Sequence, residues 1–144
     1  MNEKNIDIFL ICPVRNVDKE TEKMIAAYVK KYEDSGLKVY WPSRDTVQVD
    51  PTGGIRICRD NTCAIIQAKE IHIWWNKEST GSKFDLGVSL AAVILLAQQG
   101  ISKKIVVANP EEVQKTEIKS FENVLLSLQE LSGPSFLQNI EQLD

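Results

Sequence analysis

One stretch of the chain, residues 79–87, combines hydroxyl groups, glycine and a single carboxylate where a strand is expected to give way to a helix. It reads Ser79-Thr80-Gly81-Ser82-Lys83-Phe84-Asp85-Leu86-Gly87. A strand that leads into a helix through such a turn places backbone N–H groups and an acidic side chain at the carboxyl edge of a sheet. Ligands of open α/β sheets bind at that edge. We therefore expect Asp85, in the first turn of the helix, to face a bound ligand.

Asp85 also has a purely structural interpretation. The spacing Ser82-x-x-Asp85 resembles a capping box, in which the acid serves the helix N-terminus and its dipole. Ser79 and Thr80 are likewise ordinary N-cap residues. The two roles are compatible, so the sequence leaves both open. Asn76, at the end of the preceding strand, is a further candidate because strand ends line the ligand crevice.

Four strand–helix pairs alternate along the chain and position this stretch. The expected strands are short runs rich in β-branched residues, at residues 6–11, 37–41, 70–75 and 104–108. The expected helices follow them: from Asp18 or Thr21 to about Asp34, over 55–68, from Gly81 to a stop at Gly100, and from the Asn109-Pro110 start to about Glu130. Residues 43–54 are predicted to be a long loop, and residues 136–143 a short terminal helix.

This alternation predicts the fold. Strands separated by helices form a parallel sheet that helices cover on both faces, with right-handed crossovers. We predict an α/β, flavodoxin-like three-layer fold with four to five strands in the order 2-1-3-4(-5), as a single domain over residues 1–144. The switch point of that order lies between the first and third strands. The turns after Ile11 and Trp75 are therefore expected to open onto one crevice.

Composition excludes several classes of function. The chain has 144 residues, 43% of them hydrophobic, and a net charge of −3. No basic stripe is present, which argues against a duplex nucleic-acid partner. The N-terminal residues lack the features of a signal peptide, and the longest apolar run, residues 88–97, is short for a membrane span. These observations predict a cytoplasmic protein that does not bind a membrane.

The cysteines and the histidine do not predict a metal or redox site. Cys12, Cys58 and Cys63 form no Cys-x-x-Cys pair, and with His72 they have poor metal-ligand spacing. Reduced, packed thiols are the simplest interpretation, and His72, inside an apolar strand, is predicted to be a core histidine. Trp74 and Trp75 point to opposite faces of their strand, so one of them is expected in the core.

With these elements in place, the sequence resembles the nucleoside 2-deoxyribosyltransferase-like family, which includes the 2′-deoxynucleoside 5′-monophosphate N-glycosidases. The resemblance covers roughly residues 6–110, and its most specific part is a Gly-x-x-x-Glu-Leu-Gly helix start. Here that segment is Gly81-Ser82-Lys83-Phe84-Asp85-Leu86-Gly87. The turn after the first strand, Cys12-Pro13, corresponds to the family's Gly/Ala-Gly-Pro-like turn. The family's first-strand tyrosine is Phe9 here, and its frequent aspartate at the second helix falls at Asp60-Asn61.

The resemblance implies a role for each matched residue. The family's glutamate attacks the anomeric carbon and forms a glycosyl ester, as in retaining glycoside hydrolysis. The matching residue is Asp85, whose side chain is shorter by one methylene. Ser79, six residues earlier, matches the serine of the monophosphate hydrolases, and Arg15 matches their phosphate- or ribose-contacting arginine. The substrate-binding candidates are therefore Phe9, Cys12, Pro13, Arg15, Asn76, Ser79, Gly81 and Ser82.

Two functions follow as hypotheses. The first is cleavage or transfer of the N-glycosidic bond of a (deoxy)nucleoside 5′-monophosphate or nucleoside, with no metal or organic cofactor. The second is a nucleotide-binding or sensing module on the same scaffold, in which Asp85 accepts a hydrogen bond from a ribose hydroxyl. The family also implies a homodimer or a larger homo-oligomer. An interaction role with an incidental crevice is the remaining alternative.

Overall fold

The strands of the computed structural model form one parallel sheet in the order β2-β1-β3-β4. The structure describes residues 5–143, and its strands are β1 (Ile8–Ile11), β2 (Val39–Tyr40), β3 (Glu70–Ile73) and β4 (Lys104–Val107). Phe9 of β1 pairs with Tyr40 on one side and with Ile71 on the other. The predicted flavodoxin-like α/β fold and its strand order are confirmed.

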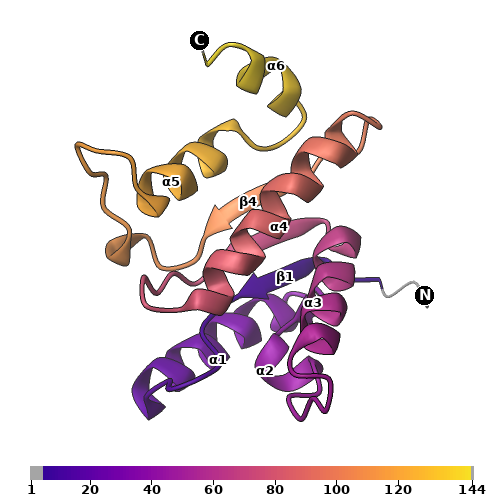
Figure 1. Ribbon diagram of the computed structural model, residues 1–144, viewed down its shortest axis with the longest axis vertical. Helices are drawn as coiled ribbons and strands as arrows, with labels where there is room; N and C mark the ends of the chain where they lie inside the picture. Colours follow the sequence, from indigo (N-terminus) through magenta and orange to yellow (C-terminus); the bar gives the residue numbers. More distant parts are fainter. Residues whose placement is uncertain (1–4, 144) are drawn as a thin grey trace.

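Helices cover both faces of this sheet (Figure 1). They are α1 (Lys19–Asp34), α2 (Pro42–Asp45), α3 (Ile55–Gln67), α4 (Thr80–Ala97), α5 (Phe121–Leu131) and α6 (Phe136–Glu141). On one face, α1 packs its buried Ile25 and Val29 against Ile8 and Leu10 of β1. On the other face, buried residues of α3, α4, α5 and α6 pack against the opposite side chains of the same strands.

Side-chain caps fix where two of these helices begin. Asp18 caps α1, because its carboxylate accepts hydrogen bonds from the Thr21 N–H and hydroxyl, both at 2.8 Å. Ser79 caps α4 by accepting the Ser82 N–H at 3.2 Å. The helix therefore starts at Thr80, and Asp85 lies in its second turn instead of the first. Asp85 plays no part in capping, which removes the capping-box interpretation of this residue.

The segment after β4 differs from the sequence prediction. Asn109 and Pro110 were expected to start a helix reaching Glu130, but a single 3₁₀ turn, Pro110–Glu112, follows instead, and α5 begins at Phe121. The Asn109 side chain is not a cap, because it bonds the backbone of Trp75. Its Oδ1 accepts the Trp75 N–H at 2.6 Å and its Nδ2 donates to the Trp75 carbonyl at 2.9 Å. Asn109 thereby joins the ends of β3 and β4.

Helix α5 covers the edge of the sheet at which the predicted order left room for a fifth strand. The Val107 N–H donates to Gln129 Oε1 at 2.6 Å, and the Ile105 N–H donates to Ser132 Oγ at 2.9 Å. These contacts satisfy N–H groups of β4 that a neighbouring strand would otherwise bind. The sheet of the described chain, residues 5–143, accordingly has four strands.

The loop predicted over residues 43–54 contains part of the one-turn helix α2, which begins at Pro42.

Helix α4 is long and apolar enough to cross a membrane by length and composition, a property that core helices of soluble proteins share. In this structure α4 packs against α3, α6 and β1.

Candidate functional site

A cavity of about 400 Å³ opens at the carboxyl end of β1, and we call it the Asp85 cavity. Its walls come from the β1–α1 loop, the segment before α3, and the start of α4. The lining residues are Cys12, Val14, Arg15, Asn16, Pro42, Gln48, Gly54, Ile57, Cys58, Asn61, Glu78, Ser79, Thr80, Gly81 and Asp85. The turns after the first and third strands therefore meet in one crevice, as the strand order predicts.

Asp85 is the most perturbed carboxylate of this cavity. Its side chain reaches the cavity wall from α4 although the residue is only 9% exposed. Burial raises its pKa from an ordinary value near 3.8 to about 6, and a hydrogen bond from Asn61 opposes that rise. With a pKa near 6, roughly nine-tenths of the groups are ionised at pH 7. A partly desolvated carboxylate beside a cavity is a typical feature of catalytic and binding sites.

The thiol of Cys12, which also lines the cavity, is unreactive. Cys12 is buried at the end of β1, and desolvation raises the pKa of its thiol to about 12, with the negative charge of Asp85 contributing. A thiol with such a pKa stays neutral at physiological pH and is a poor nucleophile. Cys12 therefore contributes shape and a neutral surface to the cavity.

Two helix N-termini point at the Asp85 cavity. Helix α3 begins after Gly54, which has a left-handed φ of 110°, and α4 begins after Ser79. Both residues line the cavity, as does Arg15, which among its described lining residues is the one lysine or arginine. Helix N-termini and an arginine attract anions, phosphate in particular. The cavity is thus lined by a carboxylate together with groups that can attract an anion.

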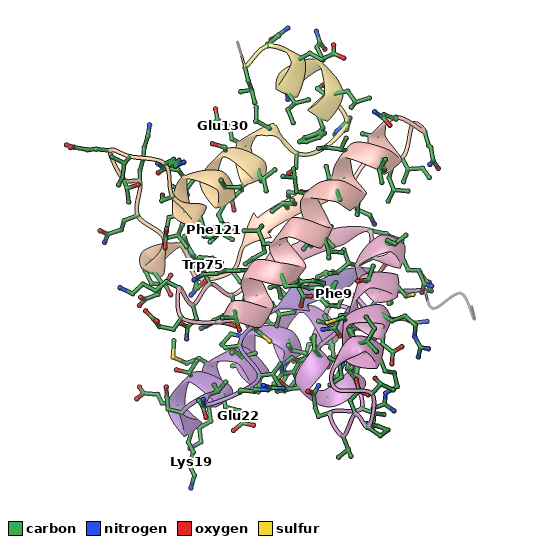
Figure 2. All side chains as sticks on the ribbon, in the orientation of Figure 1. Phe9, Lys19, Glu22, Trp75, Phe121 and Glu130 are labelled. Atoms are coloured by element: carbon green, nitrogen blue, oxygen red, sulfur yellow. The ribbon has the colours of Figure 1, made fainter. Side chains whose placement is uncertain are left out.

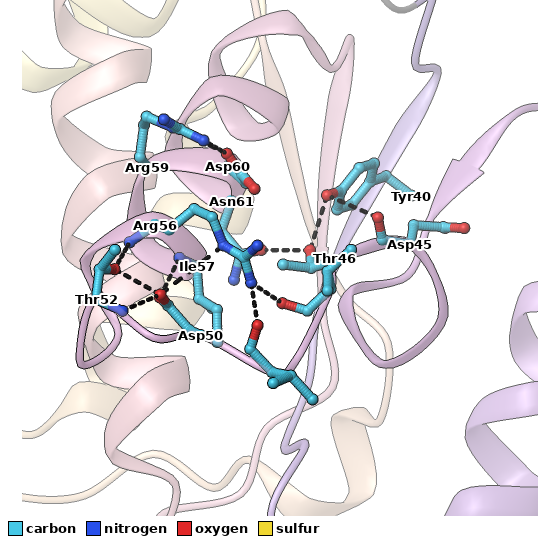
Figure 3. Close-up of polar contacts among 12 residues, drawn as sticks. Tyr40, Asp45, Thr46, Asp50, Thr52, Arg56, Ile57, Arg59, Asp60 and Asn61 are labelled. Atoms are coloured by element: carbon cyan, nitrogen blue, oxygen red, sulfur yellow. Dashed lines mark hydrogen bonds and ion pairs between the residues drawn. The ribbon is translucent and has the colours of Figure 1, made fainter.

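Hydrogen bonds hold the segment between α2 and α3, of which Gln48 and Gly54 line the cavity (Figure 3). The Asp50 carboxylate accepts hydrogen bonds from the Thr52 N–H at 2.8 Å, the Thr52 hydroxyl at 2.5 Å and the Ile57 N–H at 3.1 Å. These bonds lower the pKa of Asp50 to about 2, with the Thr52 hydroxyl contributing most. Arg56 donates to the carbonyls of Val47 and Val49. These bonds connect the segment to the start of α3.

Behind Asp85 lies a set of buried polar side chains, of which only Asn61 was named from the sequence, at the position where the resembling family has an aspartate. Asn61 Nδ2 donates to Asp85 Oδ2 at 3.5 Å, and the Thr46 hydroxyl donates to Asn61 Oδ1 at 2.8 Å. The hydroxyls of Thr46 and Tyr40 are 2.7 Å apart (Figure 3). Asn61 falls on the same helical face as Ile57, Ala64 and Ile65, so a polar residue at a core position was the signal available in the sequence.

The structure brings most of the predicted site residues to this end of the sheet. Five of them line the Asp85 cavity: Cys12, Arg15, Ser79, Gly81 and Asp85. Pro13 and Asn76 line a neighbouring cavity instead. Ser82 is buried behind the α4 N-terminus, where its hydroxyl donates to Ser79 Oγ at 2.8 Å. Phe9 is fully buried and stacks on Tyr40, with ring centroids 5.4 Å apart. Phe9 and Ser82 thus support the site from inside the core.

The neighbouring cavity measures about 660 Å³ and lies beyond the β3–α4 loop. Trp74 and Trp75 both contribute to its wall, together with Glu122, which accepts the Trp75 indole N–H at 3.0 Å. That bond lowers the pKa of Glu122. Trp75 is the core tryptophan expected from the sequence, and its ring lies beside Phe121 at a centroid distance of 6.3 Å (Figure 2). Glu78 lines both cavities.

His72 lies in the core and lines neither of these cavities. His72 is 1% exposed, with Nδ1 2.7 Å from the Tyr28 hydroxyl and Nε2 2.8 Å from Glu70, so the prediction of a satisfied core histidine is confirmed. Within residues 5–143, no group of three or more His, Cys, Asp or Glu side chains is arranged to hold a metal ion.

Comparison with protein-family models, curated proteins and solved structures found no match to this chain.

Proposed function

We propose that the protein cleaves or transfers the N-glycosidic bond of a (deoxy)nucleoside 5′-monophosphate or nucleoside, with Asp85 as the nucleophile. The observation that carries the proposal is the Asp85 carboxylate itself, which is buried, largely ionised at neutral pH and adjacent to a cavity at the carboxyl end of β1. Its place in the sequence matches the nucleophile of the nucleoside 2-deoxyribosyltransferase-like family, which the chain resembles around Asp85.

The chemistry follows from a carboxylate beside a sugar. One oxygen of Asp85 attacks the anomeric carbon, the C–N bond breaks, and its electron pair leaves with the base, which takes up a proton from the solvent. Water or a second base then attacks the anomeric carbon of the glycosyl ester, the bond to Asp85 breaks, and the carboxylate is restored. The burial of Asp85 favours this attack. Few water molecules solvate the carboxylate, so its negative charge is available to the anomeric carbon.

The rim of the cavity supports a nucleotide as substrate. Arg15, Ser79 and the start of α4 line the same cavity as Asp85. A 5′-phosphate bound there would be held by the helix N-terminus and by the guanidinium charge. The same groups would contribute much less to binding a free nucleoside, so the monophosphate is the preferred substrate of this proposal.

The test is release of free base, measured by chromatography, from a panel of ribo- and deoxyribonucleosides and their 5′-monophosphates. We expect turnover by the natural chain and its loss in Asp85→Asn. The control is Asp34→Asn, which removes an exposed carboxylate of α1 that pairs with Lys30 at 2.8 Å. No base released from any compound by the folded protein would contradict the proposal.

A binding or sensing role is the second candidate, and the deep position of Asp85 favours it. The carboxylate is 9% exposed and one methylene shorter than the glutamate of the family. A misplacement of about 1 Å lowers the rate of an enzymatic reaction roughly a hundredfold. If the protein binds a nucleotide without cleaving it, the nucleotide should raise the melting temperature of the protein and stay intact. Asp85→Glu should then introduce turnover.

A further inference from the structure

The hydrogen bonds behind Asp85 form a continuous chain that begins on the neighbouring strand. Tyr40 of β2 is 6% exposed, and its ring stacks on Phe9 of β1. Its hydroxyl lies 2.7 Å from Thr46 Oγ1 and 3.4 Å from the Asp45 carbonyl. The resembling family has a tyrosine at the position of Phe9. In this chain the phenol belongs to Tyr40 on the adjacent strand, and Phe9 stacks on its ring.

The number of protons available limits the direction of the chain. Thr46 has one hydroxyl proton, and it is donated to Asn61 Oδ1 at 2.8 Å. With that proton in use, Thr46 Oγ1 acts as an acceptor for the Tyr40 hydroxyl, which also donates to the Asp45 carbonyl at 3.4 Å. Because the Asn61 oxygen is occupied, its amide N–H₂ group faces Asp85 Oδ2, at 3.5 Å. All four residues are buried, with exposures of 6%, 4%, 8% and 9% from Tyr40 to Asp85.

We propose that Tyr40, Thr46 and Asn61 are positioning residues, which hold the Asp85 carboxylate with one oxygen bound and the other directed at the cavity. This inference rests on the proposed function for its catalytic consequence. An amide passes on no proton under these conditions, so the chain orients the carboxylate instead of relaying protons. Three separate segments supply the chain, namely β2, the segment after α2, and α3.

The chain also sets the charge of Asp85. The Asn61 hydrogen bond favours the ionised form, against the burial that raises the pKa to about 6. The other titratable groups that line the cavity with this carboxylate are Cys12, directly after β1, and Arg15, Cys58 and Glu78, and they stay unchanged in the variants below. Removal of the Asn61 N–H is therefore expected to raise the pKa of Asp85 further.

The experiment compares three variants of the full chain that each remove one polar group. They are Asn61→Leu, Thr46→Val and Tyr40→Phe. For Asn61→Leu we expect a fall in kcat of about 100-fold, the cost of misplacing a reacting group by roughly 1 Å, and a shift of the acidic limb of the pH–rate profile to higher pH. The other two variants should shift the profile in the same direction by less. The control is Tyr28→Phe, a phenol that bonds His72 on the opposite face of the sheet.

A second measurement, the NMR titration of the Asp85 carboxyl carbon, needs no turnover. A raised titration midpoint in Asn61→Leu supports the chain even if no substrate is cleaved, a result that would overturn the proposed function alone. An unchanged midpoint and an unchanged pH–rate profile in all folded variants would overturn the chain. Should Asn61→Leu fail to fold, Thr46→Val carries the same test, because it replaces a hydroxyl by a methyl group of equal size.

Discussion

Replacing Asp85 by asparagine should stabilise the protein at neutral pH. The carboxylate is buried, and its pKa in the folded chain is about 6 in place of about 3.8. A difference of roughly two pKa units corresponds to about 3 kcal/mol of free energy that opposes folding when the group is charged. Asparagine has nearly the same size and carries no charge, so Asp85→Asn removes this cost.

The pH dependence of the effect has a definite sign. The folded pKa of Asp85 is raised, so between about pH 4 and pH 6 the folded chain binds more protons than the unfolded chain. The destabilisation by Asp85 is therefore absent below about pH 4 and grows until about pH 7. The gain in stability from Asp85→Asn should follow the same course, from near zero to about 3 kcal/mol.

The assay is urea unfolding of the natural chain and of Asp85→Asn at a series of pH values from 4 to 7.5. The difference between their free energies of unfolding isolates Asp85, because the other carboxylates titrate identically in both proteins and cancel. A constant difference across this range would refute the reasoning, since it would mean that the carboxyl group titrates as an exposed one does. A constant offset that adds to the pH-dependent part is expected from the hydrogen bonds of the new amide.

Three further predictions concern groups that hold the fold or the rim of the site. Asn109→Ala leaves the Trp75 N–H and carbonyl unpaired inside the protein, and should lower the free energy of unfolding by about 2–4 kcal/mol in urea titrations; a loss under 1 kcal/mol would contradict this account of the β3–β4 junction. Gln129→Leu removes the acceptor of the Val107 N–H and should cost about 1–3 kcal/mol, with faster amide hydrogen exchange at Val107; unchanged exchange would show that α5 does not protect the edge of the sheet. Arg15→Gln should raise KM about tenfold for nucleoside monophosphates and leave KM for nucleosides unchanged; equal changes for both would place the arginine away from phosphate.

Local sequence patterns were sufficient for the sheet and for the meeting of its loops. Short β-branched runs gave the strands, and the order of a doubly wound sheet brought the turns after β1 and β3 together. The prediction of a helix directly after β4 was wrong. The pair Asn109-Pro110 is the same in sequence whether the asparagine caps a helix or binds the backbone of a distant residue. The partner of that side chain, Trp75, lies 34 residues away in the sequence, and local propensity contains no information about it.

The candidate site was predictable only in part, for a similar reason. Asp85 and Ser79 belong to one short motif, so they could be recognised together. Tyr40, Thr46 and Asn61 come from three segments and act through contacts between them. Their roles depend on tertiary structure, and of the three only Asn61, a polar residue on the apolar face of α3, could have been singled out from the sequence.

The most direct test of the central claim is to look for the glycosyl ester on Asp85. The natural chain is incubated with 2′-fluoro-substituted nucleoside 5′-monophosphates, whose electron-withdrawing fluorine slows release of the sugar, and its peptides are then analysed by mass spectrometry. The account predicts a sugar-phosphate adduct on the peptide that contains Asp85, and none in Asp85→Asn. Base release with the adduct on another residue, or with no adduct at all, would contradict it.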